Sequence, residues 1–116
     1  MAKKLRENGY YVIAYDRKYP EHLPQQEWPA NEHHIFDLRN HADYYETFRW
    51  NEFDLCAQFA CEIGGADYIF SGENDADIMF NSTQIDISVL EACRRSKVKQ
   101  ILYLSSACVY ESLSAG

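Results

Sequence analysis

The chain has 116 residues, of which 47% are hydrophobic and 25% are charged, and its formal net charge is −7. This length and balance predict one globular domain or part of one. The negative charge argues against a nucleic-acid-binding surface, for which clustered basic residues are expected. No apolar run in the sequence approaches the ~20 residues that a membrane span needs. The charged N-terminus lacks the apolar core of a signal peptide, and the cysteines show no CxxC spacing, so we expect a cytoplasmic protein.

Helix-forming segments alternate with short apolar runs along the first half of the chain. Residues 2–8 favour a helix, and Asn8-Gly9 is typical of a helix end. The β-rich run at residues 10–15 predicts a strand that leads into Asp16. All three prolines fall within residues 17–32, which predicts a loop. Further along, the pattern predicts a strand at 33–37, a helix at 42–50 and a strand at 55–60.

The second half begins with a mixed, acidic stretch at residues 66–77, for which no element is predicted. A long helix follows at 77–96. Its apolar residues recur at helical spacing and are Ile85, Val89, Leu90 and Cys93. The run at 100–105 is too short for a helix and predicts a buried strand. We therefore expect an α/β fold with a doubly wound parallel sheet containing 10–15, 33–37, 55–60 and 100–105 and the long helix on one face.

Small polar side chains follow the last predicted strand, in the run Ser105-Ser106-Ala107-Cys108. Hydroxyl and thiol groups at the carboxyl end of a buried strand lie where open α/β sheets bind ligands. An ordinary α/β core with no ligand is the alternative at this point.

Three segments carry a family resemblance: Asn81, the run Leu90-Glu91-Ala92, and residues 103–110 with the sequence YLSSACVY. Together they resemble the N…LEA…SSxxVY signature of the extended short-chain dehydrogenases/reductases, the NAD-dependent epimerases and dehydratases. The resemblance implies that residues 1–116 are a fragment of an NAD(P)-binding Rossmann-like domain. It implies NAD as cofactor, a nucleotide-sugar substrate with a GDP-hexose favoured, and a homodimer.

Three strand ends are expected to hold the cofactor. An acid such as Asp16 at this position bonds the adenosine ribose and favours NAD, although Arg17 leaves NADP open and an exposed loop aspartate is the alternative. By resemblance, Asp37 and Leu38 hold the adenine ring, and the alternative for Asp37 is a helix N-cap. The resemblance also places Phe59, Ala60 and Cys61 beneath the pyrophosphate.

The resemblance assigns the chemistry to two residues near the C-terminus. Ser106 matches the catalytic Ser/Thr, which hydrogen-bonds the reacting substrate oxygen. Cys108 matches a cysteine that acts as acid and base, a role that suits a thiol whose pKa is drawn toward neutrality. The alternative for Cys108 is a small side chain that fills space.

Gly64 and Gly65 border the sugar pocket or form a flexible connection. The histidines fit no metal site, so no metal is expected.

Two motifs of the family are absent from the sequence. No Gly-rich G-x-x-G-x-x-G run precedes Asp16, and no tyrosine has a lysine four places on. In a doubly wound sheet, a further strand would pair with both 10–15 and 55–60, and its absence leaves two unpaired edges. We therefore expect a piece of an epimerase, truncated at both ends and inactive alone. A non-catalytic α/β interaction or regulatory module is the alternative.

Overall fold

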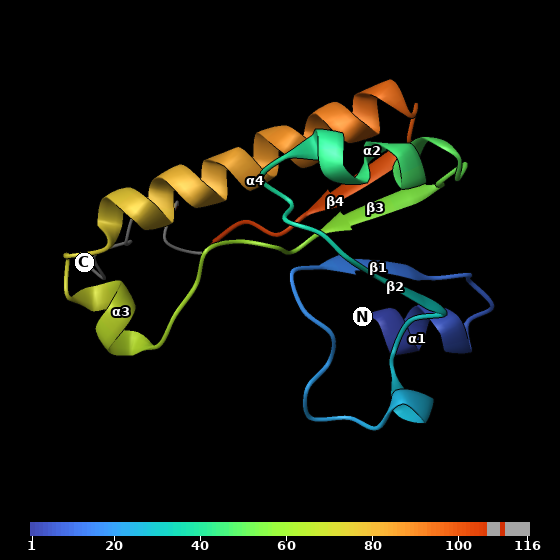
Figure 1. Ribbon diagram of the computed structural model, residues 1–116, viewed down its shortest axis with the longest axis horizontal. Coiled ribbons are helices and arrows are strands. Elements are labelled where there is room, and N and C mark those ends of the chain that lie inside the picture. The colour runs from blue at the N-terminus through green and yellow to red at the C-terminus, as the bar shows by residue number, and fades with distance from the viewer. Residues whose placement is uncertain (107–109, 111–116) are drawn as a thin grey trace, which may run out of the picture.

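Four short parallel strands form the framework of the computed structural model, which describes residues 1–106 and 110 (Figure 1). The strands are β1 (Ile13–Asp16), β2 (Glu32–Ile35), β3 (Leu55–Gln58) and β4 (Gln100–Tyr103). β1 pairs in parallel with β2, with Ile13 opposite Glu32. β3 pairs in parallel with β4, with Leu55 opposite Gln100. The α/β class, the approximate position of each strand and the parallel pairing of the last two strands are thus confirmed. The prediction that the strand at 100–105 is buried is wrong, because every residue of β4 is exposed.

The single sheet that we predicted is, however, divided into two sheets of two strands, β1-β2 and β3-β4. All four strands run in the same direction in Figure 1, with β1 and β3 as the inner members of their pairs. Strands hydrogen-bond only when they lie about 4.8 Å apart. Since no described strand lies between β1 and β3, the two sheets do not join into one.

The helices are α1 (Ala2–Glu7), α2 (His41–Arg49), α3 (Ala66–Phe70) and α4 (Asp75–Arg95), with a 3-10 turn at Gln25–Glu27. α4 begins with Asp75 and Asp77 and ends with Arg94 and Arg95, charges that complement its dipole. α3 and the 3-10 turn were not predicted, because segments of five and three residues are too short to show a helical period. Among the described helices, none is long and apolar enough to cross a membrane.

The buried residues of the hydrophobic core come from α2 and α4, and partly buried side chains of the strands, among them Tyr15 of β1 and Cys56 of β3, pack against them. These buried residues are Tyr44, Phe48, Ile85, Val89, Ala92 and Cys93. The Tyr44 hydroxyl is hydrogen-bonded to Ser88 Oγ at 2.8 Å across the two helices, so this buried polar pair is satisfied. Leu90, predicted on the apolar face, is 47% exposed. The reason is that the buried face follows Ile85, Val89 and Ala92, and Leu90 lies beyond its edge.

An aromatic cluster connects both sheets to α2. Tyr15 of β1 lies 5.7 Å from Phe48 and 6.2 Å from Tyr44, measured between ring centroids. Phe53, just before β3, lies 4.8 Å from Phe48. Phe36, just after β2, lies 6.2 Å from Tyr44. The two sheets, which share no hydrogen-bonded strand pair, are therefore held together through the rings of one helix.

Candidate functional site at the carboxyl ends of the strands

The carboxyl ends of the four strands lie on one side of the molecule, toward the left in Figure 1. This follows from the common strand direction, and it brings together segments that are far apart in sequence. The predicted site residues of this edge are Asp16, Asp37, Leu38, Phe59, Ala60, Cys61 and Ser106. Open α/β sheets bind ligands outside this edge, so the topology supports a site here.

A groove between β1 and β3 contains four of these residues. It has a volume of about 560 Å³, and Asp16, Leu38, Phe59 and Ala60 are among the residues that line it. We call it the inter-sheet groove. Asp37, Cys61, Gly64, Gly65 and Ser106 do not line it. The structure thus gathers one residue from the end of β1, one from the loop after β2 and two from the loop after β3.

Asp16 is the last residue of β1, and its side chain is exposed. One carboxylate oxygen, Oδ1, accepts a hydrogen bond of 2.6 Å from the backbone N–H of Arg17. The backbone carbonyl of Asp16 accepts from the N–H of Phe36 and so ties the strand end to the segment after β2. This geometry agrees with a ribose-binding role and equally with an exposed strand-end aspartate, so the role of Asp16 stays a prediction.

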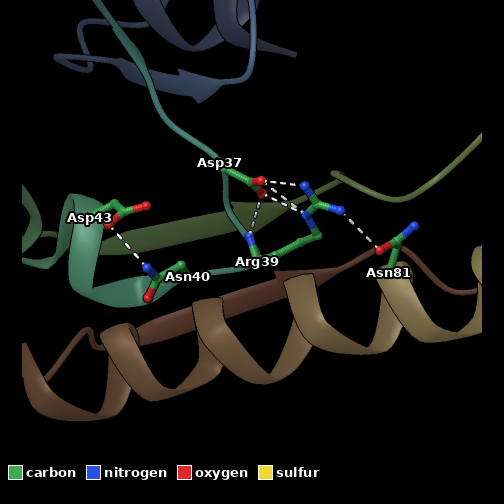
Figure 2. A network of polar contacts seen from close by, with 5 residues as sticks. All are labelled: Asp37, Arg39, Asn40, Asp43 and Asn81. Carbon is green, nitrogen blue, oxygen red and sulfur yellow. Dashed lines mark hydrogen bonds and ion pairs between the residues drawn. The ribbon is translucent and has the colours of Figure 1, made fainter.

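Asp37 forms a fork-shaped ion pair with Arg39 (Figure 2). Arg39 Nε donates to Asp37 Oδ1 at 2.9 Å and to Oδ2 at 3.0 Å, and Arg39 Nη2 also donates to Oδ2. The Arg39 backbone N–H adds a bond of 3.0 Å to Oδ1. Arg39 Nη1 reaches Asn81 Oδ1 of α4 at 3.1 Å. The charged partner and these bonds lower the pKa of the Asp37 carboxyl to about 2.

The alternative reading of Asp37 as a helix N-cap is wrong, because Asn40 takes that position. Asn40 Oδ1 accepts from the Ala42 N–H at 3.2 Å, and Asn40 Nδ2 donates to Asp43 Oδ1 at 3.0 Å (Figure 2). Leu38 is half-buried against the core, and its carbonyl accepts a 3.4 Å bond from the Tyr44 hydroxyl. The loop after β2 is therefore anchored at both ends, with Asp37 held toward Arg39.

We expect replacement of Arg39 by methionine to raise the Asp37 pKa toward its ordinary value of 3.8. The rise should be incomplete, because the backbone N–H at position 39 still bonds Oδ1. Since the folded-state pKa is lowered, the pair stabilises the fold fully above about pH 4, and this contribution is lost as the pH falls toward about 2. Both side chains are nearly half exposed, so solvent screens the pair and its contribution to stability is small.

Carbon-13 NMR titration of the Asp37 carboxyl measures this change directly. Arg49→Met, which breaks the pair of Arg49 with Glu46 on α2, is the matched control and should leave the Asp37 titration in place. An Asp37 pKa that stays near 2 in Arg39→Met would show that Arg39 is not the cause.

The loop after β3 is tied to α4 by a buried amide. Gln58 is 6% exposed, and its Nε2 donates to the Ala60 carbonyl at 2.8 Å and to Asp86 Oδ1 at 3.0 Å. Tyr103 of β4 donates to the other oxygen of Asp86 at 2.8 Å. Asp86 thus joins the ends of β3 and β4, while Phe59 and Cys61 remain exposed and Ala60 is half-buried. The small side chain of Ala60 leaves room beside the groove.

Gly64 and Gly65 lie in the segment before α3. A Cβ atom at Gly64 would come within 2.5 Å of Cδ1 of Tyr68, so the close approach of the ring requires glycine. Gly65 is the N-cap of α3, and a Cβ there would meet no atom within 4 Å. Packing against Tyr68 therefore explains the glycine at position 64. A sugar-binding role for Gly64 and Gly65 stays a prediction.

The two predicted catalytic residues follow β4. Ser106 is exposed. Cys108 lies outside the described residues. Among the described residues no group of three or more His, Cys, Asp or Glu side chains could hold a metal ion. Arg39 and the pair of Gln58 with Asp86 were missed at the sequence level. The position of a basic residue two places after Asp37 could have indicated the role of Arg39. No local pattern indicates the contact of Gln58 with Asp86.

The structure is thus an α/β fold with two small parallel sheets and a polar edge at the carboxyl ends of its strands. The profile of the NAD dependent epimerase/dehydratase family matches residues 1–115, and the chain belongs to this family. Over 110 residues it is 36% identical to GDP-mannose 3,5-epimerase 1 of Oryza sativa subsp. indica and to the enzyme of the same name in subsp. japonica. Identity to GDP-mannose 3,5-epimerase of Arabidopsis thaliana is 34%. Each match covers 95% of this chain but 28% of the relative.

The described residues fit only part of an NAD molecule. The exposed carboxylate of Asp16 and the half-buried Leu38, both in the groove, fit the adenosine half. The Asp37 carboxylate already has Arg39 as partner. A pyrophosphate is usually held by backbone N–H groups of a Gly-rich turn at a helix N-terminus, and the sequence contains no such run.

Proposed function

We propose that this chain supplies cofactor-binding and catalytic residues of an NAD-dependent nucleotide-sugar epimerase of the GDP-mannose 3,5-epimerase type. The observation that carries the proposal is the groove at the carboxyl edge, which contains Asp16, Leu38, Phe59 and Ala60. The identity of 34–36% to enzymes named GDP-mannose 3,5-epimerase supports it. The substrate is then a GDP-hexose.

In this proposal some of these residues bind the cofactor and the others contact the sugar substrate. Asp16 accepts hydrogen bonds from the adenosine ribose, and Asp37 and Leu38 contact the adenine. Phe59, Ala60 and Cys61 lie under the pyrophosphate, while Gly64 and Gly65 border the sugar. Ser106 holds the substrate oxygen, and Cys108 moves protons at the sugar carbons. Bound NAD supplies hydride acceptance and return at the sugar ring.

A homodimer is part of the same proposal. The outer face of α4 carries large apolar side chains that the core does not cover: Met79, Phe80, Ile87 and Leu90, between 47% and 74% exposed. Phe80, Ile87 and Leu90 recur at intervals of seven and three residues, which places them along one stripe of the helix. An exposed apolar stripe of this kind supports helix-to-helix contact between subunits.

A second candidate is a non-catalytic α/β interaction or regulatory module. The observation that favours it is the absence of both the Gly-rich run and the Tyr-x-x-x-Lys pair from the sequence. Proton-transfer groups each contribute ~10²–10⁴-fold to turnover. The 116-residue chain alone should therefore show no epimerase turnover under either candidate, so the test must provide the rest of an enzyme.

A chimera separates the two candidates. The 110-residue segment of the Arabidopsis thaliana enzyme that matches this chain is replaced by the corresponding residues of this chain. We expect the chimera to bind NAD and to incorporate solvent deuterium into GDP-mannose, and we expect the 116-residue chain alone to do neither. A chimera that is folded by circular dichroism but binds no NAD would favour the non-catalytic module.

In the same chimera, Asp16→Ala should reduce the preference for NAD over NADP. The Asp16 carboxylate can accept from both ribose hydroxyls and repels a 2′-phosphate, so its loss should weaken NAD binding and relieve the penalty on NADP. Calorimetric affinities for the two dinucleotides give the ratio. Asp43→Ala, on the exposed side of α2, is the control. Equal ratios for Asp16→Ala and the unaltered chimera would remove Asp16 from the site.

A further inference from the structure

Two cysteines lie against each other where α4 packs on β3 (Figure 1). Cys56 is the second residue of β3 and is half-buried, and Cys93 lies in the last turn of α4 and is 2% exposed. Their side chains are hydrogen-bonded to each other, and both lie near the hydroxyl of Tyr44. Both thiols are free. A disulfide requires two cysteine side chains that point toward each other, and thiols that share a hydrogen bond meet this requirement.

The two thiols are not equivalent. The hydrogen bond with Cys93 lowers the pKa of the Cys56 thiol, although burial opposes this change. The same bond raises the pKa of the Cys93 thiol, and burial raises it further. The thiolate is the form of cysteine that reacts with oxidants. We therefore expect Cys56 to react first and Cys93 to act as its partner.

We propose that Cys56 and Cys93 are a redox-active pair that a hydroperoxide oxidises to a disulfide joining β3 to α4. With hydrogen peroxide, the Cys56 sulfur attacks one peroxide oxygen, the O–O bond breaks, and the other oxygen leaves as water. The Cys93 sulfur then attacks the sulfenic sulfur of Cys56, so that an S–S bond forms and the S–O bond breaks, releasing a second water. The two thiols together lose two hydrogen atoms and two electrons, which reduce one peroxide to two waters.

The disulfide reinforces a connection that the fold already has. Gln58, two residues after Cys56, is hydrogen-bonded to Asp86 of α4 and so holds the end of β3 to this helix. A covalent bond between the same strand and helix prevents them from separating and restricts the unfolded chain. The proposal goes beyond the enzymatic one, because neither thiol has a role there in binding the cofactor or the substrate.

The test retains both members of the pair and removes the other two cysteines. The variant Cys61→Ser, Cys108→Ser contains only Cys56 and Cys93. Cleavage after glutamate places these two in separate peptides. The peptides are 53–62 and 92–111. After treatment with hydrogen peroxide, alkylation of the remaining thiols and cleavage, mass spectrometry should find the two peptides joined, and dithiothreitol should separate them. A non-reducing gel should show the size of a single chain.

A matched control moves one thiol by five positions. The variant Cys56→Ala, Cys108→Ser contains Cys61 and Cys93, which lie in the same two peptides. Because the hydrogen bond with Cys93 belongs to Cys56, the control should give at least about tenfold less of the joined peptides. Circular dichroism shows whether both variants are folded.

A second comparison needs no change at either thiol. In concentrated urea, where the contact between β3 and α4 is lost, Cys61→Ser, Cys108→Ser should form the disulfide at least about tenfold more slowly than in buffer. Equal amounts of joined peptides from the control, equal rates with and without urea, or a folded chain that peroxide leaves without the disulfide would each overturn the proposal.

Discussion

Replacing Phe48 by alanine should lower the free energy of unfolding by about 3–5 kcal/mol, the usual cost of removing a large core aromatic. Phe48 is 6% exposed, and its ring contacts Tyr15 of β1, Phe53 before β3 and Tyr44 of its own helix. The substitution thus removes a contact that both sheets share. Small domains have total stabilities of 5–15 kcal/mol, so this loss is a large fraction of the total.

Urea unfolding followed by circular dichroism measures the difference. Trp50→Ala is the matched control, because Trp50 is an aromatic residue only two positions away but is 75% exposed. It should change stability by less than about 0.5 kcal/mol. Similar losses for Phe48→Ala and Trp50→Ala would contradict a core centred on α2 and α4.

In the epimerase chimera, Ser106→Ala should reduce turnover by ~10²–10⁴-fold, the range that a positioned proton-transfer partner contributes. The proposed role of Ser106 is a hydrogen bond to the reacting substrate oxygen, and alanine cannot make it. Cys108→Ser should reduce deuterium incorporation as well, because a hydroxyl is a much weaker acid than a thiol.

Ser106→Ala should lower kcat and leave the affinity for NAD nearly unchanged. Ser96→Ala is the control, since Ser96 follows α4 and lies before β4, whereas Ser106 lies after it. Steady-state kinetics on GDP-mannose and calorimetry with NAD distinguish a catalytic loss from a binding loss. Full turnover in Ser106→Ala would remove this serine from the reaction.

The elements that the sequence predicts well are those with a clear period. The helix expected at 77–96 is α4 at Asp75–Arg95, and the run expected as a strand at 100–105 is β4 at Gln100–Tyr103. α3 has five residues, less than two turns, and carries no such period. Leu90 was misplaced because the buried face of α4 follows Ile85, Val89 and Ala92, and Leu90, about 100° around the helix from Val89, lies beyond the edge of that face.

The candidate site was predictable as a set of strand ends but not as a set of contacts. Alternation of strand and helix predicts that Asp16, Asp37 and Ser106 follow parallel strands and share one edge. Side-chain partners depend on tertiary packing, which the local pattern does not contain. The Arg39 contact with Asn81 spans 42 positions, and the Gln58 contact with Asp86 spans 28. The steric need for glycine at position 64 likewise comes from the Tyr68 ring, not from a turn signal.

The division into two sheets also has a consequence for how the molecule fluctuates. The β1-β2 pair is joined to the rest mainly through the rings of Tyr15 and Phe36, whereas the buried core belongs to α2 and α4. Proteins open in cooperative units whose free energies differ according to how much each unit buries. The β1-β2 pair should therefore form the less stable unit and open in native conditions while α2 and α4 remain closed. The adenosine end of the proposed site would then open and close separately from the end that contains Ser106.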